Sequence, residues 1–72
     1  QMSAKIHMRI DEIRAVDTVE EMIQFRIGRC HALKGNRKGQ YAVDLEHPYR
    51  LVFTKHGNEI EIAHILEIVD YH

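Results

Sequence analysis

Asp70, Tyr71 and His72 close the 72-residue chain, directly after the mostly apolar stretch "ILEIV". A chain terminus without a function usually frays into small polar residues. Here a carboxyl group, a phenol and an imidazole follow an extended apolar element, and each of these groups can donate or accept a proton. We therefore expect these three residues to take part in catalysis.

A second set of candidates surrounds the segment "HALKGNRKG". His31 has a side chain that titrates near neutral pH and can act as an acid or a base. Lys34, Arg37 and Lys38 are suited to binding phosphate groups. The alternatives stay open, because His31 could be a surface or capping histidine and basic loops are common.

The charge distribution agrees with an anionic partner. The chain has a net charge of -1, but residues 26–50 carry a balance of +4, whereas residues 1–25 carry -2 and residues 51–72 carry -3. A basic centre between acidic ends favours a partner that meets one surface only. The alternative is a solvated basic loop.

Arg50 lies in "PYRLVF", inside an expected strand. A guanidinium can bind a phosphate through two parallel hydrogen bonds and stays charged throughout a reaction. The alternative is a salt bridge from Arg50 to Asp44 or Glu61 on a neighbouring strand.

These residue types suit the cleavage of RNA by its own 2′-hydroxyl group. That reaction needs a base, an acid and cations that stabilise the extra negative charge on the phosphate. His31, Tyr71 and His72 can share the proton transfers, while Arg50 and Lys34 stabilise charge. Tyr71 can equally stack on a base. We expect no metal and no cofactor, because the sequence has no C-x-x-C or H-x-x-x-H spacing.

Apolar spacing predicts the elements that position these groups. Helical spacing and a capping box from Thr18 to Glu21 predict two N-terminal helices. Alternating segments then predict three strands in a meander, with a hairpin turn at "HGNE" and a bulge in the last strand, where the apolar face switches. The expected fold is α+β, with two helices packed on a small antiparallel sheet. The expected helices cover residues 3–15 and 17–25, and the expected strands cover residues 40–45, 49–55 and 60–72.

The length predicts a single domain over residues 1–72 with a small core, for which a stabilising partner or oligomer is a reasonable expectation. Disulfides within the chain are excluded because Cys30 is its single cysteine, and a lone thiol fits a reducing, cytoplasmic location. No apolar run approaches the roughly 20 residues that span a bilayer, so we expect no membrane partner.

The combination of "HALKG", "RKGQ", "YRLVF" and a closing "DYH" resembles the HigB-like toxins of the RelE/ParE superfamily. These toxins belong to bacterial type II toxin–antitoxin systems. The resemblance covers residues 29–72. It implies a ribosome-dependent mRNA endonuclease in the bacterial cytoplasm, neutralised by a HigA-like antitoxin with a helix-turn-helix domain.

The resemblance also implies a set of site residues. The histidine and lysine of the family's basic loop match His31 and Lys34, and its strand arginine matches Arg50. The terminal acid, tyrosine and histidine of the family match Asp70, Tyr71 and His72.

The resemblance has one departure, because the family usually begins with a strand and a further helix that we do not find here. We therefore expect an unpaired sheet edge, through which the chain can form a homo-oligomer. Two other hypotheses stay open. The chain can be a shortened, inactive domain that binds an antitoxin, or a ParE-type inhibitor of DNA gyrase.

Overall fold

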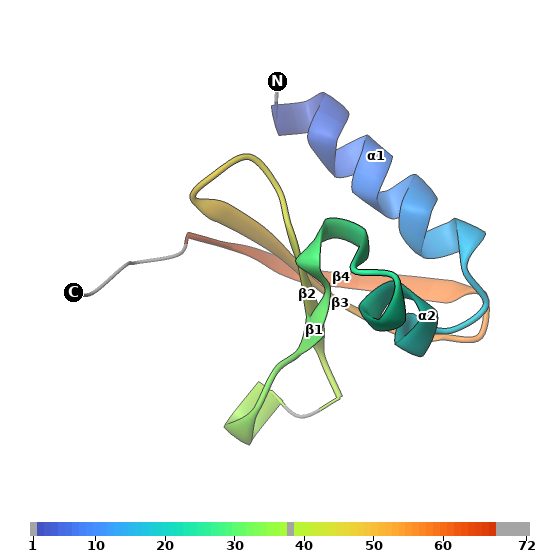
Figure 1. The fold of residues 1–72 in the computed structure, drawn as a ribbon. Coiled ribbons are helices and arrows are strands. Elements are labelled where there is room, and N and C mark those ends of the chain that lie inside the picture. Colours follow the sequence, from blue (N-terminus) through green and yellow to red (C-terminus); the bar gives the residue numbers. More distant parts are fainter. Residues whose placement is uncertain (1, 38, 68–72) are drawn as a thin grey trace.

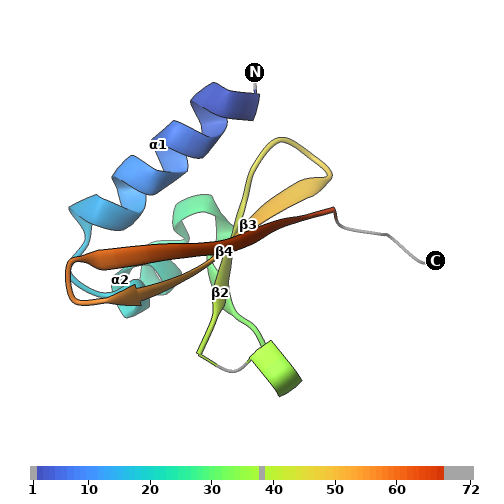
Figure 2. The same ribbon diagram turned by 180° about the vertical axis from the view of Figure 1, so that it is seen from behind.

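The computed structural model describes residues 2–37 and 39–67 and has an α+β architecture (Figure 1). Two helices precede a four-stranded antiparallel sheet with the strand order β1-β2-β3-β4. In the view from behind, β3 and β4 lie in front of α2 (Figure 2). The elements are α1 (Met2–Ala15), α2 (Val19–Gln24), the 3-10 turn η1 (Ile27–Arg29), β1 (His31–Ala32), the 3-10 turn η2 (Gly35–Arg37), β2 (Tyr41–Asp44), β3 (Tyr49–His56) and β4 (Glu59–Glu67).

Both predicted helices are present. The apolar residues of α1 recur at helical spacing, and Ile13 is completely buried while Ile6 and Ile10 pack partly buried against the core. Thr18 caps α2, since its side-chain oxygen accepts a hydrogen bond from the backbone N–H of Glu21 at 3.4 Å. No helix in the described part of the chain is long and apolar enough to cross a membrane.

The sheet has four strands, so the prediction of a three-strand meander was wrong by one strand. The additional strand, β1, has two residues, and His31 pairs with Ala42 while Ala32 pairs with Tyr41. Local apolar alternation cannot reveal so short a strand. It forms because β2 offers its free edge to the residues that follow η1.

The predicted hairpin joins β3 to β4. His56 pairs with Glu59, which leaves Gly57 and Asn58 as a two-residue loop. Gly57 has a φ of 61°, and a positive φ is what a type II′ turn requires at its first central position. The turn therefore fixes the register of the two longest strands.

The predicted bulge is also present. Val52 pairs with His64 and Phe53 pairs with Ile62, so Ala63 is an extra residue in β4. Among the described strands, β4 has β3 as its single neighbour. β4 is thus an edge strand of the described sheet, and self-association through that edge stays a prediction.

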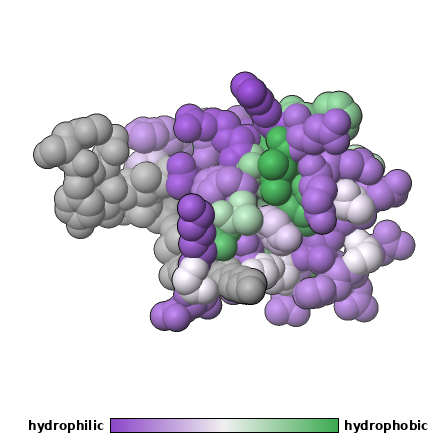
Figure 3. All heavy atoms as spheres, turned by 60° about the horizontal axis from the view of Figure 1, so that its bottom comes forward, coloured by the Kyte–Doolittle hydropathy of each residue, from purple (hydrophilic) through white to green (hydrophobic). Residues whose placement is uncertain are grey.

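The core lies between the helices and one face of the sheet. Its buried members come from both helices, from η1's C-terminal end and from the two central strands, and several are completely inaccessible. Figure 3 shows mostly polar side chains on one surface of the molecule, with an apolar strip between them. The buried cluster consists of Ile13, Val19, Met22, Cys30, Val43, Leu45, Leu51 and Phe53.

Candidate functional site

The face of the sheet that points away from the helices carries two of the predicted site residues. Directly paired residues in an antiparallel sheet place their side chains on the same face. His31 pairs with Ala42, and Ala42 pairs with Val52. Ala42 and Val52 are 1% and 0% exposed although they do not belong to the helix-facing core cluster. These two residues form a buried apolar patch, called the apolar floor, on the outer face of the sheet. His31 lies beside Ala42 at one end of this row.

Arg50 lies on the same face, two residues before Val52 and paired with Asp44. Its Nε donates a hydrogen bond to Oδ1 of Asp44 at 3.2 Å. The salt bridge to Asp44, considered from the sequence as an alternative role for Arg50, is therefore present.

Asp44 also contacts a second arginine. Its Oδ2 lies 3.5 Å from Nε of Arg29, whose side chain is 80% exposed. One carboxylate cannot neutralise two guanidinium groups, so the cluster of Arg29, Asp44 and Arg50 keeps a charge of +1. The salt bridge of Arg50 thus leaves this cluster with a net positive charge.

The helical layer supports the cluster from behind. Nε of Arg9 in α1 donates a 2.6 Å hydrogen bond to the backbone carbonyl of Asp44, and its Nη1 forms a 2.7 Å ion pair with Glu12. Gly28 allows this approach, because a Cβ atom at its position would lie 3.0 Å from Nε of Arg9. Gly28 also has a φ of 57°, which favours glycine. The turn that leads into Arg29 is therefore held against α1.

The hydrogen bond of His31 defines which of its nitrogens is available. Nδ1 lies 3.0 Å from the backbone carbonyl oxygen of Arg29. A carbonyl oxygen can only accept, so Nδ1 carries the hydrogen. In the neutral imidazole Nε2 is then the unprotonated nitrogen, which is the form that a general base needs.

The basic loop connects β1 to β2 and is closed by a 3.0 Å backbone hydrogen bond from Leu33 to Gln40. Lys34 is exposed at its start, close in sequence to His31. The backbone of Arg37 belongs to η2. Lys38 lies outside the described residues, so the grouping of the three basic residues stays a prediction.

The three terminal candidates, Asp70, Tyr71 and His72, also lie outside the described residues. The structure therefore places His31 and Arg50 on the same face of the sheet, on strands separated by β2, and does not test the terminal part of the predicted site. In the described ranges no group of three or more potential metal ligands occurs.

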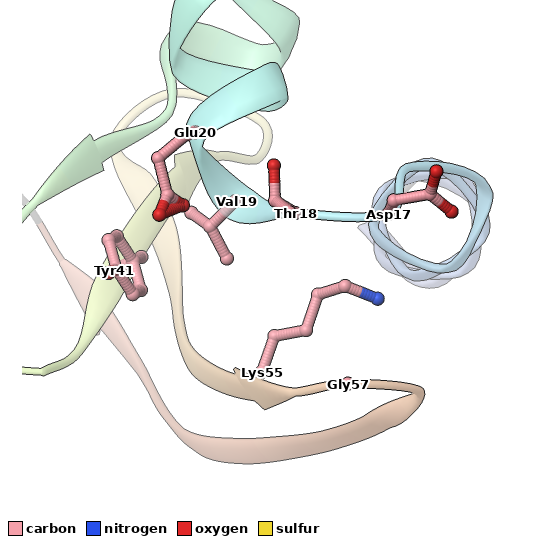
Figure 4. Close-up of a pocket in the computed structure, with 7 residues that line it drawn as sticks. All are labelled: Asp17, Thr18, Val19, Glu20, Tyr41, Lys55 and Gly57. Carbon is pink, nitrogen blue, oxygen red and sulfur yellow. The ribbon is translucent and has the colours of Figure 1, made fainter.

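One pocket lies elsewhere, between the α1–α2 connection and the β3–β4 hairpin (Figure 4). The side chain of Lys55 extends toward the connection that carries Asp17 and Thr18. None of the sequence-predicted site residues lines this pocket. Its lining residues are Asp17, Thr18, Val19, Glu20, Tyr41, Lys55 and Gly57.

Cys30 directly precedes His31 in the sequence, but its side chain belongs to the buried core and not to the candidate site. Burial raises the pKa of the Cys30 thiol to about 11. The thiol therefore stays protonated at neutral pH, which argues against a nucleophilic role.

No family model matches the chain, and no solved structure matches it. A curated protein does match. The chain is similar to "Endoribonuclease HigB" of Proteus vulgaris. The two sequences are 31% identical over 64 residues, which cover 86% of this chain and 66% of the relative.

The chain thus spans just under two thirds of the length of this HigB protein. The similarity extends over most of the chain, including the helical half that the motifs did not cover. It supports the resemblance to HigB-like toxins that the residues of the basic loop, the strand arginine and the terminus suggested.

Sequence reasoning missed Arg29 as a site residue and considered Asp44 only as a salt-bridge partner. A signal was present for Asp44, because alternation along "YAVDL" places it opposite to Val43 and Leu45. No local signal places Arg29 beside it, since that contact depends on the pairing of β1 with β2.

Proposed function

We propose that the chain is a HigB-like toxin that cleaves RNA. The observation that carries this proposal is the arrangement of His31 and Arg50 on one face of the sheet, which also carries the buried apolar residues Ala42 and Val52 and the positively charged cluster of Arg29, Asp44 and Arg50. The similarity to a protein named Endoribonuclease HigB supports the same reaction class. As in the resemblance, the proposed substrate is mRNA on the translating ribosome.

In the proposed reaction the 2′-hydroxyl attacks the adjacent phosphate and the 5′-oxygen of the next nucleotide leaves. His31 contributes Nε2, which takes up or returns a proton according to its protonation state. The guanidinium of Arg50 stabilises the additional negative charge on the phosphate. Lys34 adds positive charge near the same point.

We propose that Asp70, Tyr71 and His72 complete this site. A base and an acid are both needed. Among the described residues, His31 and His64, which pairs with Val52, lie on this face of the sheet. Of the three terminal residues, His72 has the side chain with a pKa closest to neutral, so it is the natural second proton-transfer group. Arg37 and Lys38 are proposed to bind the RNA backbone.

Cleavage of one mRNA with and without translating ribosomes tests the proposal. We expect cleavage only on ribosomes, and we expect His72→Ala and His31→Ala each to lower its rate by about 100-fold or more, as for the loss of a general acid or base. His7→Ala is the matched control, because His7 is an exposed histidine on α1. It is expected to cleave at the unmodified rate.

Unchanged cleavage by His72→Ala would remove the terminal histidine from the proposal. Absence of cleavage by the unmodified chain would reject the reaction itself. Inhibition of DNA supercoiling by gyrase would then select the ParE-type hypothesis, and tight binding of a helix-turn-helix antitoxin without growth arrest would select the inactive domain.

A further inference from the structure

Asp44 organises two positive charges in a row across the sheet. Asp44 pairs with Arg50 in β3. Arg29 is the last residue of η1, two residues before His31, whose pairing with Ala42 brings the end of this turn to β2; its Nε lies 3.5 Å from Oδ2 of Asp44. The charges therefore follow one another as Arg29, Asp44 and Arg50, in the direction perpendicular to the strands. Adjacent strands lie about 4.8 Å apart, so the two guanidinium groups can converge on the single carboxylate.

Both arginines use the same atom for this contact. Nε of Arg50 lies 3.2 Å from Oδ1 of Asp44, and Nε of Arg29 lies 3.5 Å from Oδ2. A guanidinium has five N–H donors in one plane, four of them on its terminal nitrogens. In the described part of the chain, no further hydrogen bond or ion pair involves the side chains of these two arginines. Each contact with Asp44 thus occupies Nε alone, and the terminal nitrogens are the donors that the proposal below assigns to a ligand.

The two arginines differ in how firmly they are held. The side chain of Arg50 is 29% exposed, whereas that of Arg29 is 80% exposed. Asp44 itself is fixed, because Arg9 binds its backbone carbonyl at 2.6 Å. An oriented arginine and an accessible one therefore share an immobilised carboxylate.

We propose that Asp44 is a positioning residue, which aligns Arg29 and Arg50 as one binding site for a phosphodiester group of a single-stranded RNA. The site lies next to His31, whose Nδ1 is bound to the backbone carbonyl of Arg29. The proposal rests on the proposed function, which it deepens by naming two further residues of the same site. Planar guanidinium groups fit the oxygen atoms of a phosphate.

Substitution of Asp44 distinguishes two explanations for RNA binding, the orientation of the two arginines and the net charge of the site. If charge alone decides affinity, Asp44→Asn strengthens RNA binding, because it removes a negative charge from the site. If Asp44 positions the two arginines, Asp44→Asn weakens binding although the site becomes more positive. The two explanations predict opposite signs for one substitution.

Fluorescence anisotropy with a labelled RNA of about 12 nucleotides measures this binding. The RNA carries 2′-O-methyl groups, so it cannot be cleaved through its 2′-hydroxyl. We expect Asp44→Asn and Arg29→Ala each to weaken binding about fivefold to tenfold. Over about 50–200 mM KCl, Arg29→Ala should also lower the slope of log K against log[salt] by about 1, the amount expected for one lost phosphate contact.

Two further variants separate positioning from a loss of folding or charge. Arg14→Ala removes an exposed arginine from the last turn of α1 and is expected to leave affinity within twofold. Arg29→Lys keeps the charge but lacks the planar fork, so it should restore the salt slope and only part of the affinity. Thermal unfolding of each variant checks that the melting temperature is retained.

Equal or tighter binding by Asp44→Asn, an unchanged salt slope in Arg29→Ala, or no RNA binding by the unmodified chain would each overturn the proposal. The assay does not depend on cleavage. If the unmodified chain cleaves mRNA but these variants bind as it does, the phosphate site is wrong and the proposed function stands. If it cleaves nothing but loses binding in both variants, the reaction is wrong and the phosphate site stands.

Discussion

The two faces of the sheet are buried to the same depth at the centre but differ in the side chains that border the buried residues. Val43 and Phe53, on the face toward the helices, are both 0% exposed and belong to a continuous apolar cluster. Val52, on the opposite face, is also 0% exposed, yet its row leads to His31 and the neighbouring row carries the charged pair of Asp44 and Arg50. Burial alone therefore does not distinguish the core from the buried residues beneath the proposed site. The two faces differ in the side chains next to the buried residues, which are charged or ionisable on the outer face.

The largest expected loss of stability is on the face toward the helices. Phe53→Ala removes a completely buried ring in contact with Tyr41, with ring centroids 6.0 Å apart. We expect it to lower the free energy of unfolding by about 3–5 kcal/mol, the usual cost of such a truncation in a core. Urea denaturation measures this loss, which is large for a domain of this size.

Val43→Ala and Val52→Ala form a matched pair for the two faces. Both positions are 0% exposed, and each substitution removes the same two methyl groups. We expect Val43→Ala to lower the free energy of unfolding more, because a cavity in the continuous core loses more contacts. A larger loss for Val52→Ala would show that the second face is a core in its own right.

Cys30 sharpens the comparison, because its buried thiol belongs to the core while the next residue, His31, belongs to the proposed site. Its folded pKa is raised from 9.0 to about 11 by burial, so between these values the unfolded chain loses a proton that the folded chain keeps. Stability then decreases as the pH rises. We expect a loss of about 2 kcal/mol between pH 9 and pH 11.

Urea denaturation at several pH values measures the effect, and Cys30→Ala serves as the comparison. This variant is expected to be less stable at neutral pH but to lose less stability above pH 9. Identical pH dependence for the two chains would mean that the thiol is not buried in solution.

The smallest expected effect on stability concerns Gly28, in the turn that packs against Arg9 and precedes Arg29. Gly28→Ala places a Cβ atom 3.0 Å from Nε of Arg9 and strains a residue whose φ is 57°. We expect it to lower the free energy of unfolding by about 1–2 kcal/mol, as for other residues forced into the left-handed region. We also expect weaker RNA binding, since the turn positions Arg29.

Thermal unfolding and the anisotropy assay measure these two effects in the same variant. Ala4→Gly, at an exposed position in α1, is the control for a modest loss of stability of about 1 kcal/mol without any change at the site. If Gly28→Ala loses stability but binds RNA like this control, the turn does not position the arginine.

Much of the fold was accessible from local patterns. The capping box predicts the N-cap of α2 at Thr18, and the alternation of Tyr41, Val43 and Leu45 predicts a strand. Gly57 predicts the hairpin, which the structure confirms. The strand at His31 was missed because two residues cannot display a period. Its existence depends on pairing with Tyr41 and Ala42, which lie further along the chain.

One contact of the candidate site, the salt bridge of Arg50, could be predicted from the sequence. Arg50 is unusual because a charge inside a strand needs a partner, and Asp44 was correctly named as one such partner. Arg29 carried no such signal. Its position results from the turn at Gly28 and from the register of β1 against β2, and both depend on contacts that are distant in sequence.

The extra residue in β4 has a consequence for how this sheet can change in evolution. Val52 and Phe53 are adjacent in β3, whereas their partners His64 and Ile62 are separated by Ala63. Deletion of Ala63 would leave every remaining pair facing the same partner, so the position can gain or lose a residue without shifting the pattern on either side. Homologous sheets can therefore differ in length here while they conserve both faces.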